Sequence, residues 1–150
     1  MQIRRGIGLG LLLTLGWVAA CGPKADEKLD FGTVSNDQDL VNVGQKIFFG
    51  KGQCALCHTL GGDGRGKCPD LEGAGGRLTR EFIYETLTEP DQYVRLDFDP
   101  AEPKKYPARM PAINKPPIGL NEQELLTVIA FVQSQGGRIT VNPMELKKGQ

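Results

Sequence analysis

One run of five residues, Cys54-Ala55-Leu56-Cys57-His58, restricts what this chain can fold around. Two thiols at this spacing can each add to one vinyl group of the same porphyrin, and the adjacent imidazole is then held under the iron as an axial ligand. His58 is the only histidine of the 150 residues, so no other imidazole can take this role. The run predicts one covalently bound c-type haem on Cys54 and Cys57, with His58 on the iron. Such a haem adds a large apolar plate to the core.

Two other chemistries use a Cys-x-x-Cys pair. A zinc site would need Cys54, Cys57, His58 and Cys68, and it is strained because the neighbours Cys57 and His58 would both have to reach one tetrahedral ion. A thioredoxin-like dithiol needs a βαβ context, and the sequence shows no sign of one. The haem prediction is therefore preferred over both.

The N-terminus predicts export. Arg4 and Arg5 precede an apolar stretch at 7–18, which is too short for a stable transmembrane span and is typical of a signal peptide. The following Val18-Ala19-Ala20-Cys21 resembles the lipobox of bacterial lipoproteins, in which the cysteine is acylated and becomes the new N-terminus. The alternative is ordinary cleavage after Ala20, which leaves Cys21 as a free thiol. The expected location is the periplasmic side of a bacterial membrane, with Cys21 as the lipidation site.

We expect four segments: a lipoprotein signal peptide at 1–20, a lipidated flexible tether at 21–38, one domain at 39–135 and a C-terminal tail at 136–150. Residues 22–38 are polar and rich in turn formers. Removing 1–20 takes Arg4 and Arg5 from the 18 basic residues and leaves 16, against 18 acidic residues. Without a basic excess, nucleic acid is not an expected partner.

Three helical patterns lie in the domain. The first covers about 39–49, where Leu40, Val43 and Ile47 share a face. The second covers about 79–87, with Thr79 as N-cap and Pro90 as a stop. The third follows Asn121, has Glu124 at the capping-box position, and ends before Gly136. Because the intervening stretches are rich in glycine and proline and lack period-two alternation, the sequence predicts an all-α domain with long loops.

The iron needs either a second ligand or an open position. Met110 lies between Pro107 and Pro111, which stiffen its loop, and a thioether donor raises the reduction potential of a low-spin haem. Met144 lies in the polar tail and ranks below it. Met110 is therefore the predicted second ligand, although core filling is the alternative role for this side chain. Cys68 is left over, and a small buried side chain near the haem is the preferred interpretation.

Over residues 39–135 the sequence resembles the class I, monohaem cytochromes c. Gly44-Gln45-Lys46-Ile47-Phe48 resembles the family's N-terminal helix, whose glycine and aromatic residue meet the C-terminal helix. Phe131 resembles the aromatic residue of that C-terminal helix, and Met110-Pro111 resembles the Met-Pro ligand loop. The resemblance implies a cytochrome c fold with three main helices around one haem. We expect Phe131 to pack against Gly44 and Phe48 where the two helices cross.

Two further matches assign roles by resemblance alone. Pro69 and Leu71 resemble a Gly-Pro-x-Leu segment whose proline carbonyl accepts a hydrogen bond from the ligand histidine, with Cys68 replacing the usual glycine. Gly75-Gly76-Arg77 resembles a Gly-Arg step whose arginine contacts a haem propionate. Pro69 and Arg77 are therefore expected to be cofactor-binding residues.

These expectations combine into one function: a lipid-anchored electron carrier, not an enzyme, that passes single electrons between respiratory or photosynthetic redox complexes at the membrane. Two alternatives stay open. The chain could be a haem subunit of a larger redox enzyme, or a haem sensor or peroxidase in which Met110 leaves the sixth iron position open. The loop at 90–107, with its acids, prolines and two lysines, is long enough to be functional.

Overall fold

The computed structural model of the chain describes residues 29–65, 68–93 and 110–147. These residues form helices and loops, with one isolated bridge between Arg65 and Cys68 as the only β pairing among them. The elements in chain order are η1 (Phe31–Thr33), α1 (Asp37–Phe49), η2 (Cys54–Leu56), α2 (Ala74–Arg77), α3 (Arg80–Thr88), η3 (Pro90–Tyr93), α4 (Glu122–Ser134) and α5 (Pro143–Leu146). The predicted all-α class is confirmed, and the three longest helices lie where the sequence placed them.

Side-chain caps explain where the long helices begin. Asn36 accepts a hydrogen bond from the backbone N–H of Asp39, so α1 starts two residues before the predicted position. Thr79 accepts from the N–H of Phe82 and starts α3 as predicted. Asn121 and Glu124 form the predicted capping box of α4, in which each side chain accepts from the other residue's backbone N–H.

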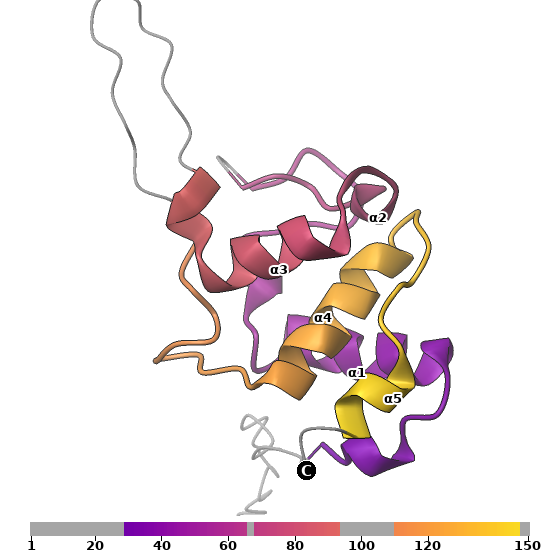
Figure 1. Ribbon diagram of the computed structural model, residues 1–150. Coiled ribbons are helices and arrows are strands. Elements are labelled where there is room, and N and C mark those ends of the chain that lie inside the picture. Colours follow the sequence, from indigo (N-terminus) through magenta and orange to yellow (C-terminus); the bar gives the residue numbers. More distant parts are fainter. Residues whose placement is uncertain (1–28, 66–67, 94–109, 148–150) are drawn as a thin grey trace, which may run out of the picture.

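The two long helices α1 and α4 cross each other (Figure 1), and Gly44 lies where α1 meets α4. A Cβ atom built on Gly44 would lie 1.9 Å from the carbonyl oxygen of Thr127 and 2.8 Å from Cβ of Phe131. Only a residue without a side chain therefore permits this approach. The rings of Phe48 and Phe131 meet beside the crossing, with centroids 5.1 Å apart. The predicted crossing and its partners are confirmed.

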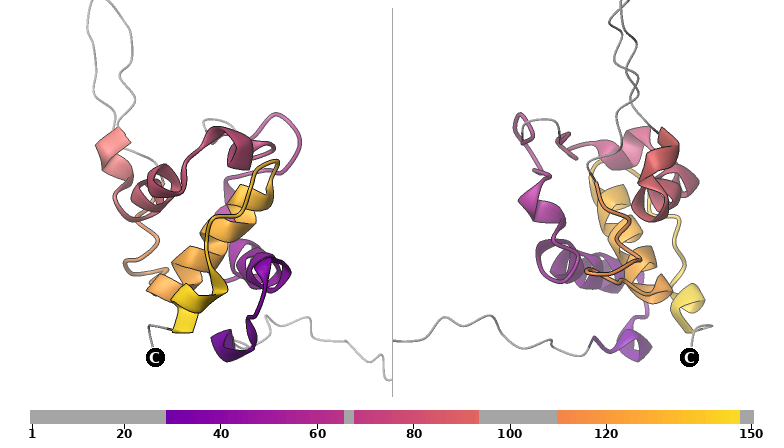
Figure 2. Two further views of the ribbon diagram at one scale, coloured as in Figure 1. Left: turned by 45° about the vertical axis from the view of Figure 1, so that its right-hand side comes forward. Right: turned by 90° about the vertical axis from the view of Figure 1, so that its left-hand side faces the viewer.

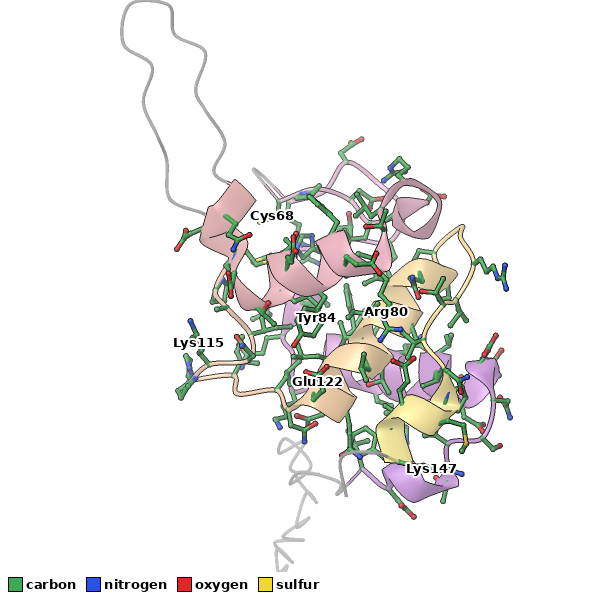
Figure 3. All side chains as sticks on the ribbon, in the orientation of Figure 1. Cys68, Arg80, Tyr84, Lys115, Glu122 and Lys147 are labelled. Carbon is green, nitrogen blue, oxygen red and sulfur yellow. The ribbon has the colours of Figure 1, made fainter. Side chains whose placement is uncertain are left out.

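Helix α3 covers a second side of α4 and buries Ile83 and Leu87. Figure 3 shows Arg80, Tyr84 and Glu122 along this junction. The Tyr84 hydroxyl donates to Glu122 at 3.0 Å, and Arg80 reaches Glu145 of α5 with two hydrogen bonds at 2.7 and 3.0 Å. These side-chain hydrogen bonds thus join α3 to α4 and to α5 at the edge of the apolar core. None of the helices in the described ranges is both long and apolar enough to cross a bilayer.

The packed unit extends beyond the predicted domain at both ends. Val34, in the predicted tether, is 1% exposed, and Leu146, in the predicted tail, is fully buried. Val141 is also buried, and α5 lies at the same end of the molecule as η1 in Figures 1 and 2. The boundaries at 38/39 and 135/136 are therefore too narrow for the core. A few isolated apolar residues in polar segments give no period, so the sequence did not indicate this packing. The signal peptide at 1–20, Cys21 and most of the loop at 90–107 lie outside the described residues.

Candidate haem attachment site

The Cys-x-x-Cys-His run forms a tight turn directly after α1. Gly50 ends α1, and the next residues lead into the single turn η2, where Gln53 has a left-handed φ of 55°. The backbone N–H groups of Cys57 and His58 both donate to the carbonyl of Cys54, at 3.1 and 2.9 Å. The turn places the two thiols in different surroundings, since Cys54 is half-buried against the core and Cys57 is exposed.

Burial changes the acidity of the first thiol. Loss of solvent raises the pKa of the Cys54 thiol from about 9 to about 11, because the thiolate would be poorly hydrated there. The Cys54 thiol also lies 3.5 Å from the carbonyl of Gly52, to which it donates. At neutral pH the folded, unmodified Cys54 is therefore a protonated and weakly nucleophilic thiol.

His58 contacts the backbone of Pro69 as the resemblance implied. Its Nδ1 lies 2.9 Å from the Pro69 carbonyl oxygen. A carbonyl can only accept, so Nδ1 carries a proton in this contact, and in the neutral imidazole Nε2 then keeps its lone pair for a metal. This is the tautomer that a histidine ligand needs, and the contact fixes the direction of the ring.

Asp70 closes the base of the loop that joins His58 to Pro69. One carboxylate oxygen accepts from the Thr59 hydroxyl and, at 2.9 Å, from the N–H of Gly61. The other accepts from the N–H of Glu72 at 2.8 Å, and the N–H of Leu71 donates to the Thr59 carbonyl at 2.9 Å. The hydrogen bond from Thr59 is the main cause that lowers the pKa of Asp70, so it remains ionised.

Met110 begins the third described range. It is half-buried and packs against the core, in a segment that the backbone bond from Ile113 N–H to the Leu87 carbonyl (2.9 Å) ties to α3. Met144, by contrast, is 60% exposed on α5. Burial at the edge of the core fits either a ligand or a core-filling role for Met110, so its bond to iron stays a prediction.

Arg77 and Cys68 have local contacts. Arg77 is the last residue of α2, and its guanidinium donates to the carbonyl of Glu72 at 2.9 Å. Its contact with a haem propionate stays a prediction. Cys68 exchanges two backbone hydrogen bonds of 3.1 Å with Arg65. Cys21 lies outside the described residues, and its lipidation stays a prediction.

The donor set fits a haem better than the alternatives. Within the described ranges, no three His, Cys, Asp or Glu side chains come together closely enough to hold a metal ion. This argues against a zinc site built from the four candidate ligands. A haem c instead needs two thiols on one turn followed by one correctly protonated imidazole, as Cys54, Cys57 and His58 provide. The described residues also contain no strand that could support a thioredoxin-like dithiol.

Sequence reasoning missed two interactions near the site. Lys51, three residues before Cys54, donates to both carboxylate oxygens of the buried Glu124, at 2.7 and 2.8 Å. The other is the network of Thr59 and Asp70. The capping pattern did single out Glu124, but its partner Lys51 is 73 residues away, and no local pattern predicts such a pair.

Comparison with known proteins yields one family. The family model described as Cytochrome c matches residues 41–136 of the chain, a range that includes α3, α4, most of α1 and every described site residue. No curated protein matches the chain.

Proposed function

Because the chain belongs to the cytochrome c family, whose members bind haem c covalently and transfer electrons through its iron, we propose that it is a monohaem carrier of single electrons. In this proposal Cys54 and Cys57 hold the haem, and His58 and Met110 bind the iron. The haem supplies a one-electron ferric–ferrous couple when bound. The observation that carries the proposal is the 2.9 Å contact between Nδ1 of His58 and the carbonyl of Pro69.

The residues of the chain then divide the work of electron transfer. His58 keeps Nε2 available because Nδ1 donates to Pro69. Met110 would supply a neutral thioether as the second ligand of the iron, which would keep small ligands away from it and favour reversible one-electron exchange over catalysis. The half-buried Cys54 and the exposed Cys57 would hold the haem through their two thiols.

The ligation is tested by the absorption spectrum of the oxidised protein. We expect the methionine–iron charge-transfer band in the wild type, its loss in Met110→Ala and its retention in Met144→Ala, because Met144 is exposed on α5. A wild-type spectrum without this band would contradict the ligation by Met110. It would favour the alternative of a sensor or peroxidase with an open iron position.

We propose further that the carrier is anchored through lipid on Cys21 at the periplasmic side of a bacterial membrane, and that its partners are membrane redox complexes. The support is the apolar stretch at 7–18 followed by Val18-Ala19-Ala20-Cys21. Cys21→Ser should move the haem protein from the membrane fraction to the soluble fraction. Purification in mild detergent separates a free carrier from a fixed subunit, because only a fixed subunit stays with its complex.

A further inference from the structure

We propose that Asp70 is a positioning residue for the iron ligand: its carboxylate closes the loop at 59–72 and so holds the Pro69 carbonyl against Nδ1 of His58. The inference rests on the proposed ligation of iron by His58. It concerns Thr59 and Asp70, to which the resemblance assigns no role.

The loop between His58 and Pro69 is long and polar. Ten residues, 59–68, separate His58 from Pro69, and the seven at 61–67 are all glycine, aspartate, arginine or lysine. Such a stretch has little apolar surface with which to hold itself in place. A backbone carbonyl at its far end will face the imidazole reliably only if the two ends are tied together.

Asp70 provides that tie. It follows Pro69 directly, and its two oxygens accept from three donors: the Thr59 hydroxyl, the Gly61 N–H and the Glu72 N–H. Thr59 in turn follows His58 directly, and its carbonyl accepts from Leu71 N–H. The residues next to the ligand and next to its acceptor are therefore joined by a side-chain bond and a backbone bond.

The negative charge of Asp70 strengthens the hydrogen bonds that its carboxylate accepts. Hydrogen bonds to an ionised carboxylate are about twice as strong as neutral ones. Asp70→Asn keeps the size of the side chain but removes the charge and replaces one acceptor with a donor. The loop should then open more often, and each opening releases the Pro69 carbonyl from the imidazole.

The test uses the single histidine of the chain. Selective ¹⁵N-histidine labelling of the reduced holoprotein gives NMR signals from His58 alone. We expect solvent exchange of the Nδ1 proton to be faster by about tenfold or more in both variants, because Asp70→Asn removes the charged acceptor and Thr59→Val removes one of its donors. Thr59→Ser retains the hydroxyl and should exchange at nearly the wild-type rate.

Asp63→Asn is the matched control. It removes the same charge from an exposed position of the same loop, so its exchange rate should equal that of the wild type. Equal rates in Asp70→Asn and Asp63→Asn would overturn the positioning role. Absence of an iron-bound Nε2 signal in the wild type would instead overturn the ligation by His58. Haem absorption and circular dichroism identify any variant that fails to fold, and Thr59→Val then gives the second measurement.

Discussion

At the residue scale, the hydrogen atom that replaces a side chain at Gly44 sets the distance between α1 and α4. The carbonyl of Thr127 occupies the space where a Cβ would be, and the backbone of a buried helix cannot move aside easily. This close approach also brings Phe48 against Phe131. The two helices that frame the attachment turn are therefore aligned by one small residue.

Gly44→Ala should lower the free energy of unfolding of the holoprotein by about 1–3 kcal/mol, because the added methyl group overpacks the crossing. On helix propensity alone the same change would stabilise by about 1 kcal/mol, so the sign of the effect is decisive. Guanidinium unfolding followed by circular dichroism measures it. Gln45→Ala, at the exposed neighbouring position, should change stability by no more than about 0.5 kcal/mol.

The acidity of Cys54 predicts a difference in reactivity between the two thiols. At pH 8, in the haem-free folded chain, a pKa of about 11 instead of about 9 leaves about a hundredfold less thiolate on Cys54. Alkylation read by peptide mass spectrometry should therefore modify Cys57 much faster than Cys54. In denaturant the two rates should become similar, and equal rates in the folded chain would contradict the prediction.

The same shift gives stability a pH dependence. The folded form of the haem-free chain holds the Cys54 proton more tightly than the unfolded form. The contribution of this proton to the stability of the folded form is fully present below about pH 9 and is lost as the pH rises to about 11. Attachment of haem removes the titrating thiol, so the holoprotein should lack this component.

At the scale of elements, the start of α4 is joined to the attachment turn. Glu124 is 5% exposed, caps its own helix through the N–H of Asn121, and accepts two hydrogen bonds from Lys51. Lys51 lies between the end of α1 and Cys54. One buried carboxylate thus connects the helix crossing with the residues that lead into the haem turn.

Lys51→Met should lower the free energy of unfolding by about 1–3 kcal/mol, because it leaves the buried carboxylate of Glu124 without its cation. The double variant Lys51→Met/Glu124→Gln should lose less unfolding free energy than the sum of the losses in the two single variants, since the two side chains form one interaction. Lys115→Met, at an exposed lysine, is the control and should have little effect. Additive effects in the double-mutant cycle would show that the pair is not coupled.

At the scale of the whole molecule, the ends of the described chain complete the core. Leu146 and Val34 are buried, and Arg80 joins α3 to α5 through Glu145. Leu146→Ala should therefore lower the free energy of unfolding by about 2–4 kcal/mol, the cost of a cavity in a packed core. Met144→Ala, two residues away and exposed, should change it by about 0.5 kcal/mol or less. Similar small effects of both changes would mean that the segment after α4 does not support the fold.

The long helices could be predicted because their information is local. Asn121 with Glu124, and Thr79 with Pro90, mark helix ends within a few residues, and apolar spacing marks the buried faces. The short elements α2 and α5 have four residues each, too few to show a period. The bonds of Lys51 to Glu124 and of Thr59 to Asp70 depend on how the chain folds back. For that reason the attachment residues and the Pro69 contact could be read from the sequence, but Lys51, Thr59 and Asp70, which support them, could not.

The burial of Val34 has a consequence for how the carrier meets its partners. With the proposed anchor on Cys21, a leash of 22–38 would reach at most about 60 Å, whereas residues 22–28, those before the described chain, reach at most about 25 Å. The accessible volume scales roughly with the cube of this reach, so the shorter leash raises the local concentration of the domain near the bilayer by about tenfold. Under the proposed anchoring, the packing of residues 29–34 against the core would make encounters more frequent, but only with partners whose sites lie close to the membrane surface.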